Sequence, residues 1–259
     1  MPTVQTRPIM GLSAQFALLA MLASTVGLSG FGWIVGMACG AVTNEALARG
    51  LARHGALGLG PADRVTLGRA TLAGGVAALT ADSFWRPSLV TTLVALTIVA
   101  LVLDAVDGWV ARRTGTVSAL GARFDMEVDA LLILVLSVYV ASSIGAWVLA
   151  IGAARYAFVA ATRVLPWLRA PMPTRYWGKV VAATQGVVLT VAAAEVMPRY
   201  AVIAALAAAL VMLAESFGSQ VWWLWLHRPI ASGSLVASPV VRVRRARVGQ
   251  LAAAGARHV

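Results

Sequence analysis

Eight apolar stretches of membrane-spanning length follow one another along this chain. They lie near residues 9–28, 31–48, 65–83, 88–111, 119–142, 146–165, 178–195 and 199–226. A helix needs about 20 mainly apolar residues to cross the hydrocarbon core of a bilayer. The composition, 60% hydrophobic and 12% charged, agrees with that environment. We therefore expect an all-α, polytopic membrane protein with about eight transmembrane helices.

The positive charges predict an orientation for these spans. If the N-terminus is inside, the outer loops contain only Arg86 and Arg199, and most other basic residues lie at the inner ends of the spans. Inner loops of membrane proteins are enriched in Lys and Arg. We expect the N-terminus, the acidic stretch described next and the C-terminal tail on the cytoplasmic side of the cell membrane. This pattern explains the formal charge of +11 without nucleic acid as a partner.

Five of the ten acidic residues fall between Asp104 and Asp129, directly between two apolar runs. Charged groups inside a membrane are costly and indicate a functional site. In helical geometry Asp104 and Asp107 share one face, and Gly121, Asp125 and Asp129 form a row on the next helix. A short turn joins the two helices, so their acidic faces can meet.

Four carboxylates around one small volume cannot all remain ionised in a low dielectric unless cations neutralise them. Ligand sets made only of oxygen favour hard cations such as Mg²⁺ or Mn²⁺, which also bind substrate phosphates. The acidic stretch therefore predicts a divalent metal site that receives a phosphorylated substrate.

The same stretch resembles the signature of the CDP-alcohol phosphatidyltransferase family. The matching positions are Asp104, Asp107, Gly108, Ala111, Arg112, Gly121, Asp125 and Asp129, all at the family's spacing. The resemblance extends over roughly 62–226. It implies the six-helix core of that family, here preceded by an N-terminal two-helix hairpin. It also implies Mg-dependent transfer of a phosphatidyl group from CDP-diacylglycerol to a polar alcohol, with release of CMP.

The resemblance also implies roles for these residues. Asp104, Asp107 and Asp125 would hold two divalent ions on the donor diphosphate. Asp129 would accept the proton of the attacking hydroxyl, and in the family this position usually binds metal as well. The CDP pocket would consist of Asp104, Asp107, Gly108, Ala111, Arg112, Gly121 and Asp125.

Basic residues outside the motif point to the acceptor. Arg155 lies deep in its span, so it needs an anionic partner, either a motif carboxylate or a substrate phosphate. Together with Arg175 and Lys179 it could form a basic pocket, which favours glycerol 3-phosphate or inositol phosphate over serine or free inositol. Family members often have threonine where this chain has Ala182, so the acceptor contacts stay open. Arg69 either faces the nucleotide or anchors its helix at the inner side.

We divide the chain into three parts. Residues 1–60 form a transmembrane hairpin and an interfacial linker, residues 61–228 form the core, and residues 229–259 form a basic tail. The tail is expected to be disordered and attracted to anionic membrane lipids. In the hairpin, the row GxxxGxxxG allows a close helix approach, either to the core or to a second copy in a homodimer. The row consists of Gly32, Gly36 and Gly40.

Two other classes of membrane protein also use intramembrane carboxylates. A UbiA-like prenyltransferase combines Asp-rich helices with Mg²⁺ and a lipid diphosphate, but its two acidic motifs are far apart in sequence. A non-enzymatic transporter or scaffold has no need for Gly108, Ala111 and Arg112 at these spacings. Release of CMP in the presence of Mg²⁺ distinguishes the phosphatidyltransferase from both.

Overall fold

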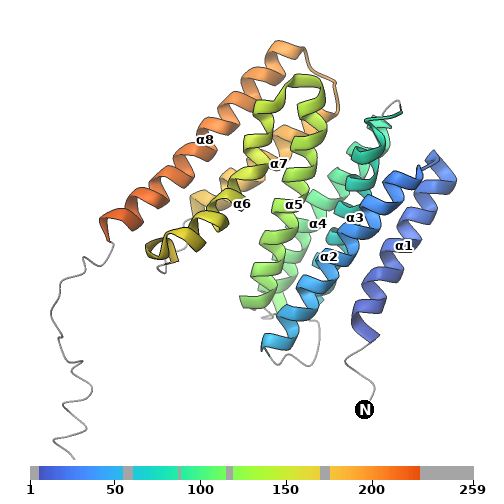
Figure 1. Ribbon diagram of the computed structural model, residues 1–259, viewed down its shortest axis with the longest axis horizontal. Coiled ribbons are helices and arrows are strands. Elements are labelled where there is room, and N and C mark those ends of the chain that lie inside the picture. The colour runs from blue at the N-terminus through green and yellow to red at the C-terminus, as the bar shows by residue number, and fades with distance from the viewer. Residues whose placement is uncertain (1–5, 55–60, 87–88, 115–118, 170–175, 228–259) are drawn as a thin grey trace, which may run out of the picture.

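The computed structural model describes residues 6–54, 61–86, 89–114, 119–169 and 176–227. These residues form eight α-helices and two short 3₁₀ helices, without a strand among them (Figure 1). The α-helices are α1 (Thr6–Val26), α2 (Gly30–His54), α3 (Pro61–Asp82), α4 (Val90–Thr114), α5 (Ala119–Ile144), α6 (Leu149–Val164), α7 (Tyr176–Ala193) and α8 (Arg199–Leu226). The 3₁₀ helices are η1 (Ala146–Val148) and η2 (Pro166–Arg169). The predicted all-α fold is confirmed.

Not every described helix is apolar enough to cross a membrane on its own. Four stretches qualify by length and composition, and they are Val90–Val110, Gly121–Ile144, Ala146–Val164 and Arg199–Leu226. Met10–Val26 and Trp177–Ala193 are apolar but shorter. The remaining two helices, α2 and α3, contain more small and polar residues. The polytopic membrane class is thus supported, with four of the eight described helices long and apolar enough to span by themselves.

The place of α3 in the bundle explains its composition. It contacts α1, α2, α4 and α5, and every residue from Ala73 to Asp82 is buried. Residues 72–82 of α3 read LAGGVAALTAD, and most of them are alanine or glycine. Small side chains allow neighbouring helices to approach closely. A helix that other helices enclose does not need a surface that matches lipid.

The glycine row of α2 packs within this chain. A Cβ atom on Gly36 would lie 2.8 Å from the Leu19 side chain on α1 and 3.1 Å from Ala78 on α3. A Cβ atom on Gly40 would lie 2.6 Å from Gln15. The row therefore brings α1 and α2 onto the central helix, and a homodimer contact would have to use another surface.

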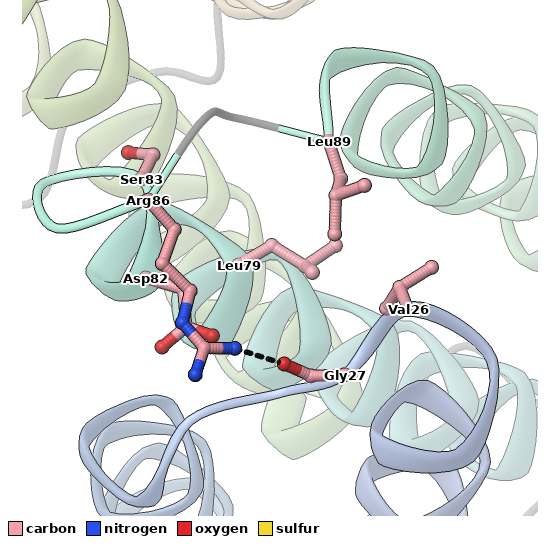
Figure 2. A pocket seen from close by; sticks show the side chains of 7 residues that line it. All are labelled: Val26, Gly27, Leu79, Asp82, Ser83, Arg86 and Leu89. Atoms are coloured by element: carbon pink, nitrogen blue, oxygen red, sulfur yellow. Dashed lines mark hydrogen bonds between the residues drawn. The ribbon is translucent and has the colours of Figure 1, made fainter.

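A polar connection fixes the turn of the hairpin to the end of α3. The buried Asp82 carboxylate accepts hydrogen bonds from the Ser29 backbone N–H, at 2.8 Å, and from the Ser29 hydroxyl. Arg86 donates to the Gly27 carbonyl at 2.6 Å, as Figure 2 shows. Gly27, Asp82 and Arg86 line a small cavity of about 230 Å³ together with Val26, Leu79, Ser83 and Leu89. The hairpin is thereby held at the end of the bundle away from the motif aspartates.

One boundary differs from the prediction. Helix α2 continues to His54, whereas its span was expected to end near residue 48 and to lead into an interfacial linker. The extra turns are stabilised by packing, because Leu47 is buried and Leu51 lies against the same cluster. Residues 55–60 and the C-terminal tail lie outside the described residues.

Candidate active site

The four aspartates of the motif surround a single arginine, Arg69. Asp104 and Asp107 lie one turn apart on α4, and Asp125 and Asp129 lie one turn apart on α5. The first three offer carboxylate oxygens that all lie within 4.8 Å of one another. The two acidic faces therefore meet, as the helical spacing indicates.

Arg69 comes from the central helix α3 and its side chain is 0% exposed. Its Nη1 lies 2.8 Å from an Asp104 oxygen and 2.9 Å from an Asp107 oxygen, and it also contacts Asp125. The other terminal nitrogen, Nη2, pairs with Asp129. The sequence suggested that Arg69 faces the nucleotide or anchors its helix. In the structure it is the shared ion-pair partner of the motif carboxylates, a role that neither suggestion included.

Thr66 adds a second contact from α3. It lies one turn before Arg69, and its hydroxyl donates to an Asp107 oxygen at 3.1 Å. Asp107 is the most enclosed of the four aspartates, with 6% of its side chain exposed. The signal that could have identified this pair is a threonine and an arginine one turn apart, followed by an uncharged stretch that extends to Asp82.

The charges of the cluster do not balance. Four carboxylates and one guanidinium give −4 + 1 = −3 when all are ionised. Each carboxylate has two oxygens, and Arg69 contacts one of each. The side chains of Asp104, Asp125 and Asp129 are 40%, 33% and 31% exposed, so these carboxylates are partly accessible. This oxygen-only donor set fits Mg²⁺ or Mn²⁺.

A groove of about 560 Å³ opens beside Asp104 between α4 and α7. The side of the groove formed by α7 is mainly apolar, and its two polar residues are Lys179 and Thr184. Its lining residues on α7 are Lys179, Val180, Ala183, Thr184, Val187 and Val188. The groove therefore joins the acidic cluster to an apolar helix face, an arrangement suited to a ligand with a charged and an apolar part.

The other predicted CDP-pocket residues lie on the same two helices as the aspartates. Gly108 directly follows Asp107 on α4, and Gly121 lies one turn before Asp125 on α5. Both are half-buried. Ala111 and Arg112 belong to α4 by their backbone, and their side chains lie outside the described part of the chain.

Arg155 has a partner that the sequence analysis did not consider. Its Nη2 pairs with the Glu127 carboxylate on α5. At about 100° per residue, Glu127 projects roughly 200° away from Asp125 around the helix. Of the two partners that the sequence left open, neither a motif aspartate nor a substrate phosphate is needed to explain the position of Arg155. The helical phase of Glu127, the fifth acid of the stretch, could have indicated this pairing.

Two of the three basic residues expected at the acceptor, Arg155 and Lys179, do not line the same pocket. Lys179 lies at the start of α7 and lines the groove beside Asp104. Arg155 lies on α6, on the opposite side of α5 from the motif aspartates. Arg175 falls outside the described residues. Lys179 is thus the predicted acceptor residue that the structure brings next to the acidic cluster.

Comparison with known proteins agrees with the geometry. A family model described as CDP-alcohol phosphatidyltransferase matches residues 61–226. The match begins at the first residue of α3 and ends at the last residue of α8. It includes Arg69 and all four aspartates but not the α1–α2 hairpin. No curated protein and no solved structure matches the chain.

Proposed function

We propose a specific reaction for this chain, which belongs to the CDP-alcohol phosphatidyltransferase family. Membership makes it a transferase of phospholipid head-group chemistry, and its apolar helices indicate a membrane protein. The reaction we propose is transfer of a phosphatidyl group from CDP-diacylglycerol to a polar alcohol. The acceptor oxygen forms a bond to the phosphorus that carries diacylglycerol, and the bond from that phosphorus to the bridging oxygen of CMP breaks.

The observation that carries this proposal is the residual negative charge around Arg69. Asp104, Asp107 and Asp125 would hold Mg²⁺ or Mn²⁺, with two ions in the complete site and Asp129 as a further ligand. When bound, such cations neutralise the donor diphosphate and stabilise the charge that develops on the departing CMP. Since one guanidinium would leave a charge of −3 with all four carboxylates ionised, the cluster has negative charge and partly exposed carboxylates for such cations.

The chain's residues then divide the remaining work. Arg69 holds α3, α4 and α5 together through its ion pairs, which keeps the carboxylates in a fixed relation before substrate arrives. Asp129 is proposed as the general base that takes the proton from the acceptor hydroxyl. The partial exposure of its side chain, 31%, supports this role. Gly108, Ala111, Arg112 and Gly121 are proposed to shape the CDP pocket.

The groove between α4 and α7 supports a lipid donor. Its mouth carries Asp104, and its apolar wall continues along α7. We propose that an acyl chain of CDP-diacylglycerol lies against this wall while the diphosphate reaches the aspartates. The basic inner loops support an active site on the cytoplasmic side of the cell membrane.

The acceptor we propose is a phosphorylated alcohol, glycerol 3-phosphate or inositol phosphate. Lys179 at the groove mouth supports this choice, and Arg175 is a further candidate from the sequence. The pairing of Arg155 with Glu127 removes the argument that Arg155 needs a substrate phosphate. The choice of a phosphorylated acceptor therefore rests mainly on Lys179.

Purified protein in lipid nanodiscs tests the proposal directly. CDP-diacylglycerol, Mg²⁺ and one acceptor at a time from glycerol 3-phosphate, inositol phosphate, inositol and serine are added, and CMP and the lipid product are measured. We expect CMP with one phosphorylated acceptor and none in EDTA. CMP release with serine or inositol alone would refute the acceptor assignment. Absence of CMP with every acceptor would favour a scaffold or transport role, and pyrophosphate release from a prenyl diphosphate would favour the prenyltransferase.

A further inference from the structure

A small hydrophobic cluster lies behind the acidic site and is separate from the main core. Its buried members are Leu47 on α2, Ala70 on α3, and Phe124 and Val128 on α5. Leu51 and Leu67 pack at its edge. This cluster joins the N-terminal hairpin to two of the helices that form the site.

The members of this cluster are sequence neighbours of the site residues. Ala70 directly follows Arg69, Phe124 precedes Asp125, and the residue before Asp129 is Val128. Consecutive residues on a helix point about 100° apart, so each apolar side chain flanks the charged one next to it. When α5 is placed so that its aspartates reach Arg69, its apolar row therefore also contacts α2 and α3.

The contacting rows have matching geometry. Leu47 and Leu51 are four residues apart on α2, and Phe124 and Val128 are four residues apart on α5. Rows with this spacing pack into each other's grooves when two helices cross. Exposed fractions of 6% for Leu47 and 1% for Val128 show that little space is left between them. Removing Leu47 would leave a cavity where α5 is supported.

The hairpin can provide this support because it is fixed along α3. Gly36 lies against Ala78 in the middle, and Asp82 binds Ser29 at the far end. A helix held at those two points presents its last turns to α5 as a fixed surface. The ion pairs of Arg69 at 2.8 and 2.9 Å to α4 depend on helix positions being kept within a few tenths of an ångström.

We infer that Leu47 and Leu51 are positioning residues for the metal-binding carboxylates of α5. The hairpin is then part of the framework of the active site, although it lies outside the segment that the family model matches. This inference rests on the proposed metal-dependent function. A chain without residues 1–48 is then expected to lose part of the motif geometry.

The test compares two leucine truncations in the full-length protein. Leu47→Ala removes the support of α5, and Leu22→Ala is the matched control, because Leu22 is 1% exposed in the main core near the far end of α1. Mn²⁺ binding is measured without substrate by the electron paramagnetic resonance signal of free Mn²⁺, and thermal stability is measured in parallel. Both variants should lose stability. Only Leu47→Ala should weaken Mn²⁺ binding, by about tenfold or more, the usual effect of losing support behind a metal ligand.

Two further variants complete the experiment. Leu47→Met restores most of the side-chain volume and should restore Mn²⁺ binding to within about threefold of wild type. If Leu47→Ala does not yield folded protein, Leu51→Ala at the edge of the cluster should show a smaller change in the same direction. Unchanged Mn²⁺ binding in these truncations, or equal weakening in Leu22→Ala, would refute the inference alone. Wild-type protein that binds no Mn²⁺ and releases no CMP would refute the proposed function itself.

Discussion

Replacing Arg69 by methionine isolates the charge that the motif carboxylates share. The new side chain is long and apolar, but the cluster changes from −3 to −4 when all four carboxylates are ionised. Removing one partner of a buried ion pair typically costs about 3–5 kcal/mol. Arg69 is 0% exposed and has several partners, so we expect its loss to fall in this range. That corresponds to about two to four orders of magnitude in the folding equilibrium constant.

Divalent metal should compensate this loss in part. A cation that binds only the folded state stabilises it by mass action, and a more negative cluster binds it more tightly. We therefore expect Arg69→Met to be much less stable than wild type in EDTA and to gain more stability than wild type on addition of Mg²⁺. The assay is denaturant unfolding of purified protein in detergent micelles, followed by helical circular dichroism with EDTA or Mg²⁺.

Arg155→Met provides the matched control, since Arg155 is also an arginine within an apolar span. Its side chain is 30% exposed and pairs with a half-exposed Glu127. We expect a loss of about 1 kcal/mol or less and no specific response to Mg²⁺. Equal losses in the two variants, or a Mg²⁺ effect that is the same in wild type and Arg69→Met, would refute the assignment of Arg69 as the internal counter-charge.

Three further predictions concern the site and its support. Asparagine at Asp104, Asp107 or Asp125 should each reduce CMP release by about 10³-fold or more, because a charged ligand is lost from the cation site, and normal turnover in any of them would contradict that site. Lys179→Ala should raise the acceptor KM about tenfold at an unchanged donor KM, as measured with a phosphorylated acceptor, whereas an unchanged acceptor KM would remove the main support for this choice. Gly36→Leu should lower the unfolding midpoint, since its Cβ atom would lie 2.8 Å from a side chain of α1, and wild-type stability would show that the hairpin packs loosely.

The sequence predicted the features that depend on local pattern. Helix bounds agree within a few residues for most spans, because apolar runs end at charged or turn-forming residues. The meeting of Asp104 with Asp125 followed from helical periodicity and a short turn between two helices. Family spacing added the roles of these residues, which the geometry alone does not assign.

Features that depend on the arrangement of distant helices were not predicted. The position of Arg69 among four carboxylates requires α3 to lie between α2, α4 and α5, and nothing in its own sequence specifies those neighbours. Glu127 was counted only as one of the five acids of the stretch, and its pairing with Arg155 on another helix was not predicted. Leu47 and Val128, which share one hydrophobic cluster, lie far apart in the sequence.

The enclosure of α3 has a consequence for how this protein enters its membrane. Among the described helices, α3 is not one of those apolar enough to cross a bilayer by itself, and it carries Arg69 into the interior. A segment of this kind partitions poorly into lipid during synthesis, since a central arginine is unfavourable for insertion. The α1–α2 hairpin is translated earlier and offers a glycine-lined surface that α3 can contact as it leaves the translocation channel. Biogenesis of the catalytic helices would therefore depend on a hairpin that is made before them.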